Sequence, residues 1–255
     1  MPNVACISDI HGNLLALKAV LADIRSIGGD LILCAGDLVG YGPFPNEVID
    51  EIKSQNIQTV IGNYDEAVGF KLPVCGCHID DPVQKRYSDH ALKWAIDHTS
   101  AQSREYLRSL PEQLSLDVSG KKLLIVHASA DSLNEYIYAT DEERIADLLV
   151  GIEEDFYVYG HTHFPYIKKR ADKLIVNAGS VGRPKQGDTR ASYALLEINP
   201  KSVHACIRKV AYDVEQTAND IIAKGLDPYF AEFLLNGGKV KPGECDADHS
   251  CGCEV

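Results

Sequence analysis

The stretch Asn3-Val4-Ala5-Cys6-Ile7-Ser8-Asp9-Ile10-His11-Gly12 is a short apolar run followed at once by a carboxylate, an imidazole and a glycine. Val4 to Ile7 has the composition of a strand, and apolar residues at helical spacing follow from Asn13. Asp9 and His11 therefore lie just beyond a predicted strand, where both can turn toward one point above the sheet. Carboxylate oxygen and imidazole nitrogen together suit a divalent transition metal. The alternative is that Asp9 is a turn residue and His11 the neighbour of a helix cap.

The same arrangement recurs twice in the first 65 residues. Residues 31–35 form a continuous apolar run that ends in Gly36-Asp37-Leu38-Val39-Gly40, and a third strand is predicted over 59–61, ahead of Gly62-Asn63-Tyr64-Asp65. The segments between these strands, 13–27 and 46–54, have helical periodicity. Open α/β sheets place their sites at the carboxyl ends of the strands. We therefore expect the polar residues that follow the three strands to meet at one edge of a sheet.

Between residues 66 and 120 the strand–helix pattern is interrupted. Two helices are predicted here, over about 83–98 and 101–110, after irregular chain marked by Pro73 and Pro82. We expect this insertion to supply no strand of the repeat and to form a cap or side wall over the site.

The strand pattern then resumes and delivers three histidines. A strand over 122–126 precedes His127, and a strand over 155–159 precedes His161 and His163. The remaining predictions are strands at 166–170, 173–176, 192–198 and 203–210, one helix over 214–235, and a loose cysteine-bearing tail from Gly237.

Composition limits the functional class. The chain has 255 residues, 45% hydrophobic and 24% charged, and a net charge of −12, which argues against binding nucleic acid or membranes through a basic surface. It has no apolar run of 18 residues and no secretory signal, so we expect a cytoplasmic protein. In that compartment its eight cysteines are expected to be free thiols or metal ligands.

Five blocks of the sequence, taken together, resemble the calcineurin-like metallophosphoesterases, especially the small bacterial and archaeal phosphodiesterases. The blocks are Asp9-Ile10-His11, Gly36-Asp37 with the glycine-rich residues after it, Gly62-Asn63-Tyr64-Asp65, Val126-His127-Ala128 and Gly160-His161-Thr162-His163. The resemblance implies an α/β fold, a four-layer α/β/β/α sandwich with two central mixed sheets. We expect a single domain over 1–236, with the cap insertion at about 66–120, and a separate tail over 237–255.

The resemblance also implies a ligand set for two divalent metal ions. Asp9, His11 and His163 would hold the first ion and Asn63, His127 and His161 the second, with Asp37 bridging them. Manganese is our first choice, while iron, zinc, nickel or cobalt could take its place. Two cations would activate a hydroxide for in-line attack on phosphorus.

One block departs from the family pattern. The family usually carries histidine, a general acid, where this chain has Tyr64, whose hydroxyl can donate a hydrogen bond but cannot mimic imidazolium charge. We therefore expect either a preference for good leaving groups or an acid from the cap, His98 or His90. Asp65 is expected to orient a ligand.

Arg183, in the loop after the predicted strand 173–176, is a candidate contact to a substrate phosphate. The alternative for this glycine-containing loop is a plain structural turn.

Two Cys-Gly-Cys pairs could hold a structural zinc ion. The four thiols are Cys75, Cys77, Cys251 and Cys253, although structural zinc sites commonly have longer spacings. The alternative is that these thiols are unpaired or redox-labile.

The sequence thus predicts a metal-dependent phosphoesterase, either a phosphodiesterase or a nucleotide-type hydrolase. Its partner would be a small phosphate ester, with a nucleotide as one option and homo-oligomerisation left open. The alternatives are a noncatalytic metal-binding scaffold on the same fold and a protein Ser/Thr phosphatase.

Overall fold

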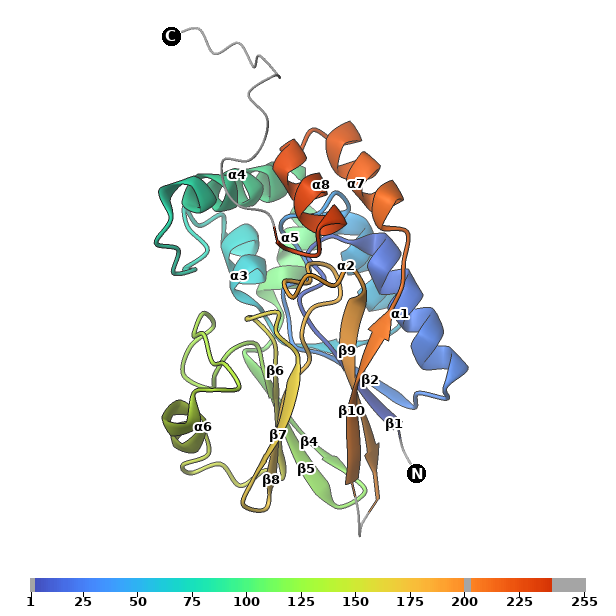
Figure 1. The fold of residues 1–255 in the computed structure, drawn as a ribbon, viewed down its shortest axis with the longest axis vertical. Coiled ribbons are helices and arrows are strands. Elements are labelled where there is room, and N and C mark those ends of the chain that lie inside the picture. Colours follow the sequence, from blue (N-terminus) through green and yellow to red (C-terminus); the bar gives the residue numbers. More distant parts are fainter. Residues whose placement is uncertain (1–2, 200–202, 240–255) are drawn as a thin grey trace, which may run out of the picture.

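The computed structural model describes residues 3–199 and 203–239, which form two five-stranded mixed sheets with helices outside them (Figure 1). The strand order is β10-β9-β1-β2-β3 in the first sheet and β4-β5-β6-β8-β7 in the second. The first sheet consists of β1 (Asn3–Ile7), β2 (Leu31–Cys34), β3 (Gln58–Thr59), β9 (Ala191–Ile198) and β10 (Val203–Val210). The second consists of β4 (Gln113–Val118), β5 (Lys121–Val126), β6 (Phe156–Tyr159), β7 (Tyr166–Arg170) and β8 (Lys173–Asn177).

Strand β1 shows how the sequence builds the layers. Alternate side chains of a strand point to opposite faces, and both faces of β1 are buried. Val4 and Cys6 pack between the two sheets with residues such as Ile125 and Val176. Ala5 and Ile7 face the other way, toward the helices.

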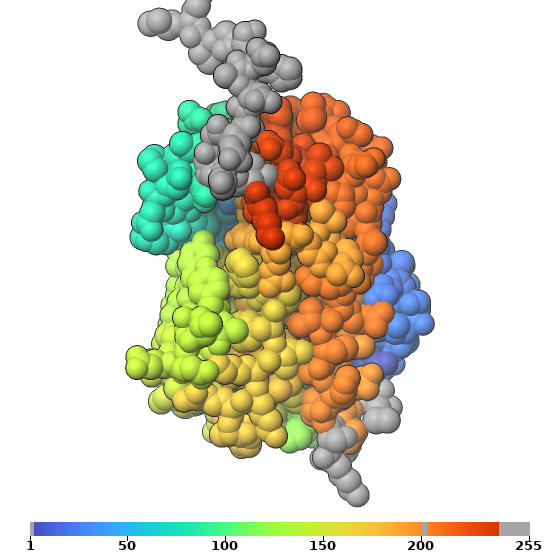
Figure 2. Space-filling model, viewed as in Figure 1, coloured from blue at the N-terminus to red at the C-terminus, as the bar shows by residue number. Residues whose placement is uncertain are grey.

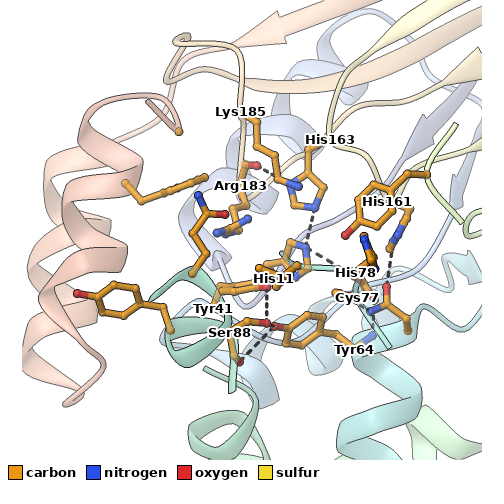
Figure 3. Close-up of a pocket in the computed structure, with 18 of the residues that line it drawn as sticks. His11, Tyr41, Tyr64, Cys77, His78, Ser88, His161, His163, Arg183 and Lys185 are labelled. Carbon is orange, nitrogen blue, oxygen red and sulfur yellow. Dashed lines mark hydrogen bonds and ion pairs between the residues drawn. The ribbon is translucent and has the colours of Figure 1, made fainter. Parts of the chain in front are cut away.

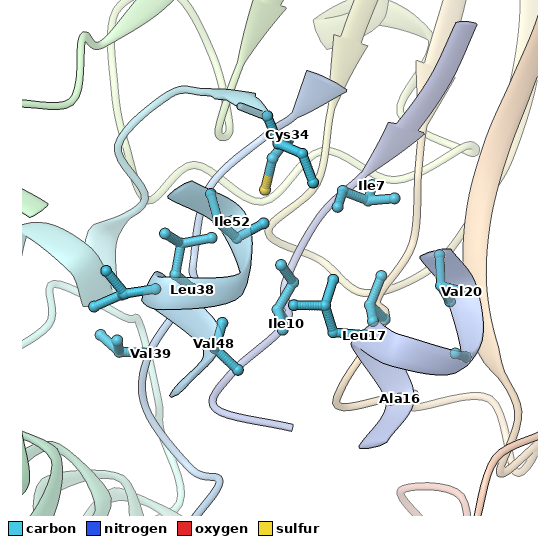
Figure 4. Packing of buried hydrophobic residues seen from close by; sticks show 14 of the residues in the cluster. Ile7, Ile10, Ala16, Leu17, Val20, Cys34, Leu38, Val39, Val48 and Ile52 are labelled. Carbon is cyan, nitrogen blue, oxygen red and sulfur yellow. The ribbon is translucent and has the colours of Figure 1, made fainter. Parts of the chain in front are cut away.

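Two of these outer helices, α1 (Leu14–Ser26) and α2 (Pro45–Ser54), cover the first sheet. Leu17, Val48 and Ile52 from the two helices pack in one core cluster with Ile7 (Figure 4). On the outer face of the second sheet, α6 (Glu142–Leu148) packs Ile145 on the strands. The result is the predicted sandwich of four layers.

The parallel strands bring separate loops to one edge of the molecule. β1 pairs with β2 in parallel, and β2 with β3. In the second sheet β5, β6 and β8 are also parallel. The carboxyl ends of parallel strands meet at the same edge, so the loops after these strands adjoin one another.

Five further helices stand around this edge. They are α3 (Asn63–Phe70), α4 (Pro82–His98), α5 (Ala101–Arg108), α7 (Val214–Ala223) and α8 (Pro228–Leu235). Ala91 of α4 packs in one cluster with Ile221 of α7 and Phe230 of α8. Figure 1 shows these three helices at the end of the molecule toward which β6 and β10 run.

Three expectations about secondary structure are wrong. The 66–120 segment does supply a strand, because β4 pairs antiparallel with β5. The single helix expected over 214–235 is two helices, interrupted before Pro228, which stands in the first turn of α8. Helices α3 and α6 were not expected.

No helix among the described residues is long and apolar enough to cross a membrane.

Candidate metal centre

Three side chains from distant loops form the first group of candidate ligands. The Nε2 atoms of His11 and His163 lie 3.1 Å apart. Asp9 Oδ1 is 3.7 Å from His11 Nε2 and 3.2 Å from His163 Nε2. Asp9 Oδ2 accepts hydrogen bonds from Ser8 Oγ and the His161 backbone, whereas the buried Oδ1 has no hydrogen-bond partner.

The hydrogen bonds of the two imidazoles indicate which nitrogens carry lone pairs. His11 Nδ1 lies 3.1 Å from the Val39 carbonyl and His163 Nδ1 lies 2.6 Å from the Arg183 carbonyl. Since a carbonyl can only accept, each Nδ1 is assigned the proton of a neutral ring. The Nε2 lone pairs therefore face each other, and a cation between them would remove this repulsion.

A second group has the same character. His127 Nε2 and His161 Nδ1 each lie 3.0 Å from Asn63 Oδ1 and 3.2 Å from each other. Asn63 Nδ2 donates to the Cys75 carbonyl, so its oxygen faces the imidazoles. His127 Nδ1 lies 2.7 Å from the Ala35 carbonyl, which leaves a lone pair on Nε2. Three potential acceptors thus converge on one point.

Asp37 lies between the two groups. Its Oδ2 is 3.7 Å from His11 Nε2 and 3.5 Å from His127 Nε2. Its Oδ1 accepts a hydrogen bond of 2.8 Å from the Tyr64 backbone N–H. Asp37 thus has a carboxylate oxygen within 3.7 Å of an imidazole nitrogen from each group.

Electrostatics around these ligands fit a cation. Burial lowers the pKa of all four imidazoles and brings that of His163 to about 3, so the rings are neutral at physiological pH. Burial, Asp65 and Asp9 raise the pKa of Asp37 well above its usual range. Neutral imidazoles and carboxylates in a buried cluster are a donor set for a divalent transition metal.

Five of the seven candidate ligands have left-handed backbone conformations, which are uncommon for residues other than glycine. Such strain gathers at functional sites, where the surrounding structure holds it in place. The φ angles are 53° at Asp9, 49° at His11, 57° at Asp37, 62° at His161 and 65° at His163.

Asp65 and a glycine hold the loops in register. Asp65 accepts hydrogen bonds from the backbone N–H groups of Leu38, Val39 and Gly62, which ties the Asp37 loop to the Asn63 loop. A Cβ atom at Gly160 would lie 2.3 Å from Asp9 Oδ2, so only glycine fits beside that carboxylate.

Five of the seven candidate ligands, all but Asp9 and His127, line a cavity of about 700 Å³ (Figure 3). Tyr64 is buried in its wall, and its hydroxyl lies 2.9 Å from Ser88 Oγ of α4. Burial raises the pKa of Tyr64 well above its usual value, so the hydroxyl keeps its proton. Arg183 also lines this cavity.

Two predicted acids lie elsewhere. His98 and His90 line a separate surface depression beside Trp94 and do not line the cavity. The His98 ring stacks on that of Trp94, with centroids 4.0 Å apart. The structure therefore does not bring His98 or His90 together with the candidate ligands.

Of the four Cys-Gly-Cys thiols, Cys75 and Cys77 lie near the cavity, while Cys251 and Cys253 are outside the described residues. Asn63 Nδ2 is 3.3 Å from Cys77 Sγ, and the hydrogen bond with Cys77 lowers the pKa of Cys75 to about 6. The shared structural zinc remains a prediction.

Sequence reasoning missed several residues that line the cavity. Lys185 stands two positions after Arg183, in the loop that the sequence had already singled out, and burial lowers its pKa to about 8. The aromatic wall gave no signal, because its members come from five separate segments of the chain. They are Tyr41, Tyr87, Tyr136, Tyr138, Phe164, Tyr229, Phe230 and Phe233.

Comparison with known proteins agrees with this geometry. The chain is 32% identical over 254 residues to an uncharacterized protein of Methanocaldococcus jannaschii, which covers 92% of this chain and 98% of that protein. It is 26% identical over 208 residues to phosphodiesterase YfcE of Escherichia coli K12, covering 78% of this chain and 89% of that enzyme.

Two solved structures are also similar to this chain over most of its length. A metallophosphoesterase from Sphaerobacter thermophilus has a TM-score of 0.76 at 30% identity and covers 92% of this chain and 99% of its own. A hypothetical protein from Pyrococcus horikoshii shares the fold, with a TM-score of 0.80 at 24% identity, over 94% of this chain and all 100% of its own.

Residues 3–201 match the family described as the calcineurin-like phosphoesterase superfamily domain. This match covers more than half of the chain and includes every candidate ligand. The chain therefore belongs to the calcineurin-like phosphoesterase superfamily and is a hydrolase that acts on phosphoester bonds.

Proposed function

We propose that the protein is a phosphodiesterase or nucleotide-type hydrolase that works with two divalent metal ions. The observation that carries this proposal is the presence of two groups of nitrogen and oxygen atoms, each of which converges on one point. Asp37 lies near an imidazole of each group. Asp9, His11 and His163 would hold one ion, and Asn63, His127 and His161 the other. Mixed nitrogen and oxygen ligands favour Mn²⁺, with iron, zinc, nickel or cobalt as alternatives.

When bound, two divalent cations would lower the pKa of a coordinated water molecule and would polarise the phosphoryl oxygens of the substrate. The chain's own residues do the rest. The carbonyls of Val39, Arg183 and Ala35 fix the tautomers and ring planes of three imidazoles. Asp65 keeps the Asp37 and Asn63 loops together.

Tyr64 stands where the family carries its general acid. Since its hydroxyl stays protonated, it can donate a hydrogen bond to a phosphoryl or leaving oxygen, but it is a much weaker acid than an imidazolium. This supports substrates whose leaving group needs little protonation, such as a nucleotide or a pyrophosphate moiety.

A catalytic role is favoured over a metal-binding scaffold because the candidate ligand set is complete. The cavity of about 700 Å³ is also of a size that encloses small molecules. Its aromatic wall supports a substrate with a ring, such as a nucleobase.

The test is hydrolysis of bis-p-nitrophenyl phosphate by protein freed of metal and then reloaded with Mn²⁺, compared with the monoester p-nitrophenyl phosphate. We expect turnover of the diester that requires added metal. His127→Asn and His163→Asn should lower kcat at least 100-fold, since loss of a ligand disrupts the activated water. His204→Asn, at an exposed position on β10, is the matched control. Absence of metal-dependent turnover in the wild-type protein would refute the proposal.

A further inference from the structure

Two cationic side chains of the cavity wall, Arg183 and Lys185, have no acidic partner. Neither takes part in any ion pair among residues 3–199 and 203–239. Lys185 Nζ has one hydrogen-bond contact, at 3.5 Å to the Thr162 carbonyl. Since charges removed from water are normally paired, two unneutralised cations in a cavity wall indicate that the cavity receives an anion.

Aromatic rings hold the Arg183 guanidinium in place. Its central carbon lies 3.9 Å from the Tyr41 ring centroid and 4.0 Å from the Phe233 ring centroid. Stacking uses the faces of the guanidinium plane, while the N–H groups point outward along its edges. These edges remain available for the two parallel hydrogen bonds that a phosphate accepts from arginine.

Both cations adjoin the candidate metal centre through the backbone. The Arg183 carbonyl accepts a hydrogen bond from His163 Nδ1. Lys185 Nζ contacts the carbonyl of Thr162, the residue between His161 and His163. Figure 3 shows the Arg183 and Lys185 side chains on the His163 side of the cavity, away from Cys77.

Charge balance separates this pair from the metal centre. The positive charge of two divalent cations would exceed the negative charge of the Asp9 and Asp37 carboxylates. The excess could by itself balance the charge of the scissile phosphoryl group. Arg183 and Lys185 add two positive charges beyond that need. Across the cavity, His78 pairs with Asp80, and Asp80 and Asp81 make that rim acidic, so the cationic patch lies on one side only.

We propose that Arg183 and Lys185 form an anion subsite beside the metal centre, which selects substrates carrying a second phosphoryl group next to the scissile one. This inference rests on the proposed function, since it assigns the scissile group to the metal centre. It goes beyond that function by naming what the rest of the substrate must carry.

Two chromogenic esters with the same nucleoside and the same leaving group test the subsite. They are the p-nitrophenyl ester of thymidine 5′-monophosphate and the γ-p-nitrophenyl ester of thymidine 5′-triphosphate. In each, water adds to the terminal phosphorus and the P–O bond to p-nitrophenolate breaks. With Mn²⁺ in excess, we expect kcat/KM to be at least tenfold higher for the triphosphate ester.

Arg183→Gln and Lys185→Met should each reduce this preference at least fivefold. Arg25→Gln and Lys18→Met, at exposed positions of α1, are matched controls that should keep it. A second readout is competition by the reaction products: thymidine 5′-triphosphate should inhibit the wild-type enzyme more strongly than thymidine 5′-monophosphate, and this difference should shrink in both variants.

The outcomes separate the two proposals. If the wild-type protein hydrolyses neither ester with any of the candidate metals, the proposed function fails. If it hydrolyses both but the variants lose activity equally on each, the function stands and the subsite is refuted, because the two cations then act on the scissile group itself.

Discussion

At the scale of single residues, Asp65 supports the candidate site without facing the cavity. Its oxygens accept from Leu38 N at 2.8 Å, Val39 N at 3.3 Å and Gly62 N at 3.1 Å. In Asp65→Asn an amide NH₂ would face one of these donors and leave it unsatisfied, at a cost of about 1–3 kcal/mol. We expect urea unfolding of the metal-free protein to report that loss, and calorimetric titration to report weaker Mn²⁺ binding. Asp50→Asn, an exposed acid on α2, is the control, and unchanged stability of Asp65→Asn would contradict this role.

Tyr64 is a second single residue with a testable role, and we expect its substitution to change the rate of hydrolysis. Tyr64→Phe removes the hydroxyl and keeps the ring, so we expect kcat for a phosphodiester to fall at least tenfold. This lower bound is below the roughly 10²–10⁴-fold that general acid catalysis contributes, because a phenol is a weaker acid than an imidazolium. Ser88→Ala removes the partner that lies 2.9 Å from this hydroxyl and leaves the phenol in place. If both variants are equally slow, Tyr64 acts by holding α4 and not by contact with the phosphoryl group.

That the seven candidate ligands come together was predictable from the sequence, but their backbone conformation was not. Each candidate ligand follows an apolar run that reads as a strand, and parallel strands bring such residues to one edge. The left-handed conformations of Asp9, His11 and His161 depend on tertiary hydrogen bonds, such as Asp9 N to the Gly36 carbonyl and His161 N to Asp9 Oδ2. No local pattern encodes partners 27 or 152 positions away.

At the scale of elements, helix α8 places aromatic side chains against the cavity. Asp227 caps the helix by accepting from Tyr229 N at 2.9 Å. Asp227→Ala should lower the free energy of unfolding by about 1 kcal/mol and speed hydrogen exchange in the first turn of α8. Because Phe230 and Phe233 line the cavity, we also expect a higher KM for the triphosphate ester. Asp213→Ala, which removes the cap of α7, is the control; an equal rise in KM there would contradict a specific role for α8.

A second helix, α1, is held to the first sheet by an ion pair between Asp23 and Arg208. Asp23 accepts from Arg208 Nε at 2.8 Å, from Arg208 Nη2 at 3.0 Å and from Tyr193 Oη at 2.7 Å. Arg208 and then Tyr193 lower the pKa of Asp23 below its usual value. The stabilisation is therefore present above the unfolded pKa of about 3.9 and is lost as the pH falls through the folded pKa. Asp23→Asn should cost about 1–2 kcal/mol at pH 7 and less at pH 3, by urea unfolding. A difference from wild type that does not change with pH would contradict this account.

The elements that sequence reasoning missed are those with weak local signals. Strand β4 alternates exposed and half-buried residues, with Leu114, Leu116 and Val118 packed against the core between the sheets. This period of two residues was present, but β4 directly follows two helices and was included in the cap. The break before α8 was marked by Gly225, with φ of 77°, and by Pro228.

At the scale of the whole molecule, the candidate site joins parts of the chain that are remote in sequence. His11 and His163 are 152 positions apart, and Phe233 of α8 stacks on Arg183. In Figure 2, the segments near residue 80 (cyan), residue 140 (yellow-green) and residue 230 (red) share one face of the molecule. Binding at this point therefore depends on the complete fold, and it should in turn stabilise the complete fold.

This coupling predicts the effect of metal on unfolding. In the metal-free chain, Asp9 Oδ1 is buried without a hydrogen-bond partner and the Nε2 lone pairs of His11 and His163 face each other. A bound cation would remove both unfavourable interactions and so would stabilise the folded state. At one hundred times its Kd, a ligand adds about 2.7 kcal/mol of stability. For a domain of this size, that is roughly 5–10 °C in Tm. We expect Mn²⁺ to produce this shift by calorimetry and Ca²⁺, which prefers oxygen ligands, to produce a smaller one. The His127→Asn/His163→Asn double variant should lose the Mn²⁺ effect; if it keeps the full shift, the stabilising ion binds somewhere else.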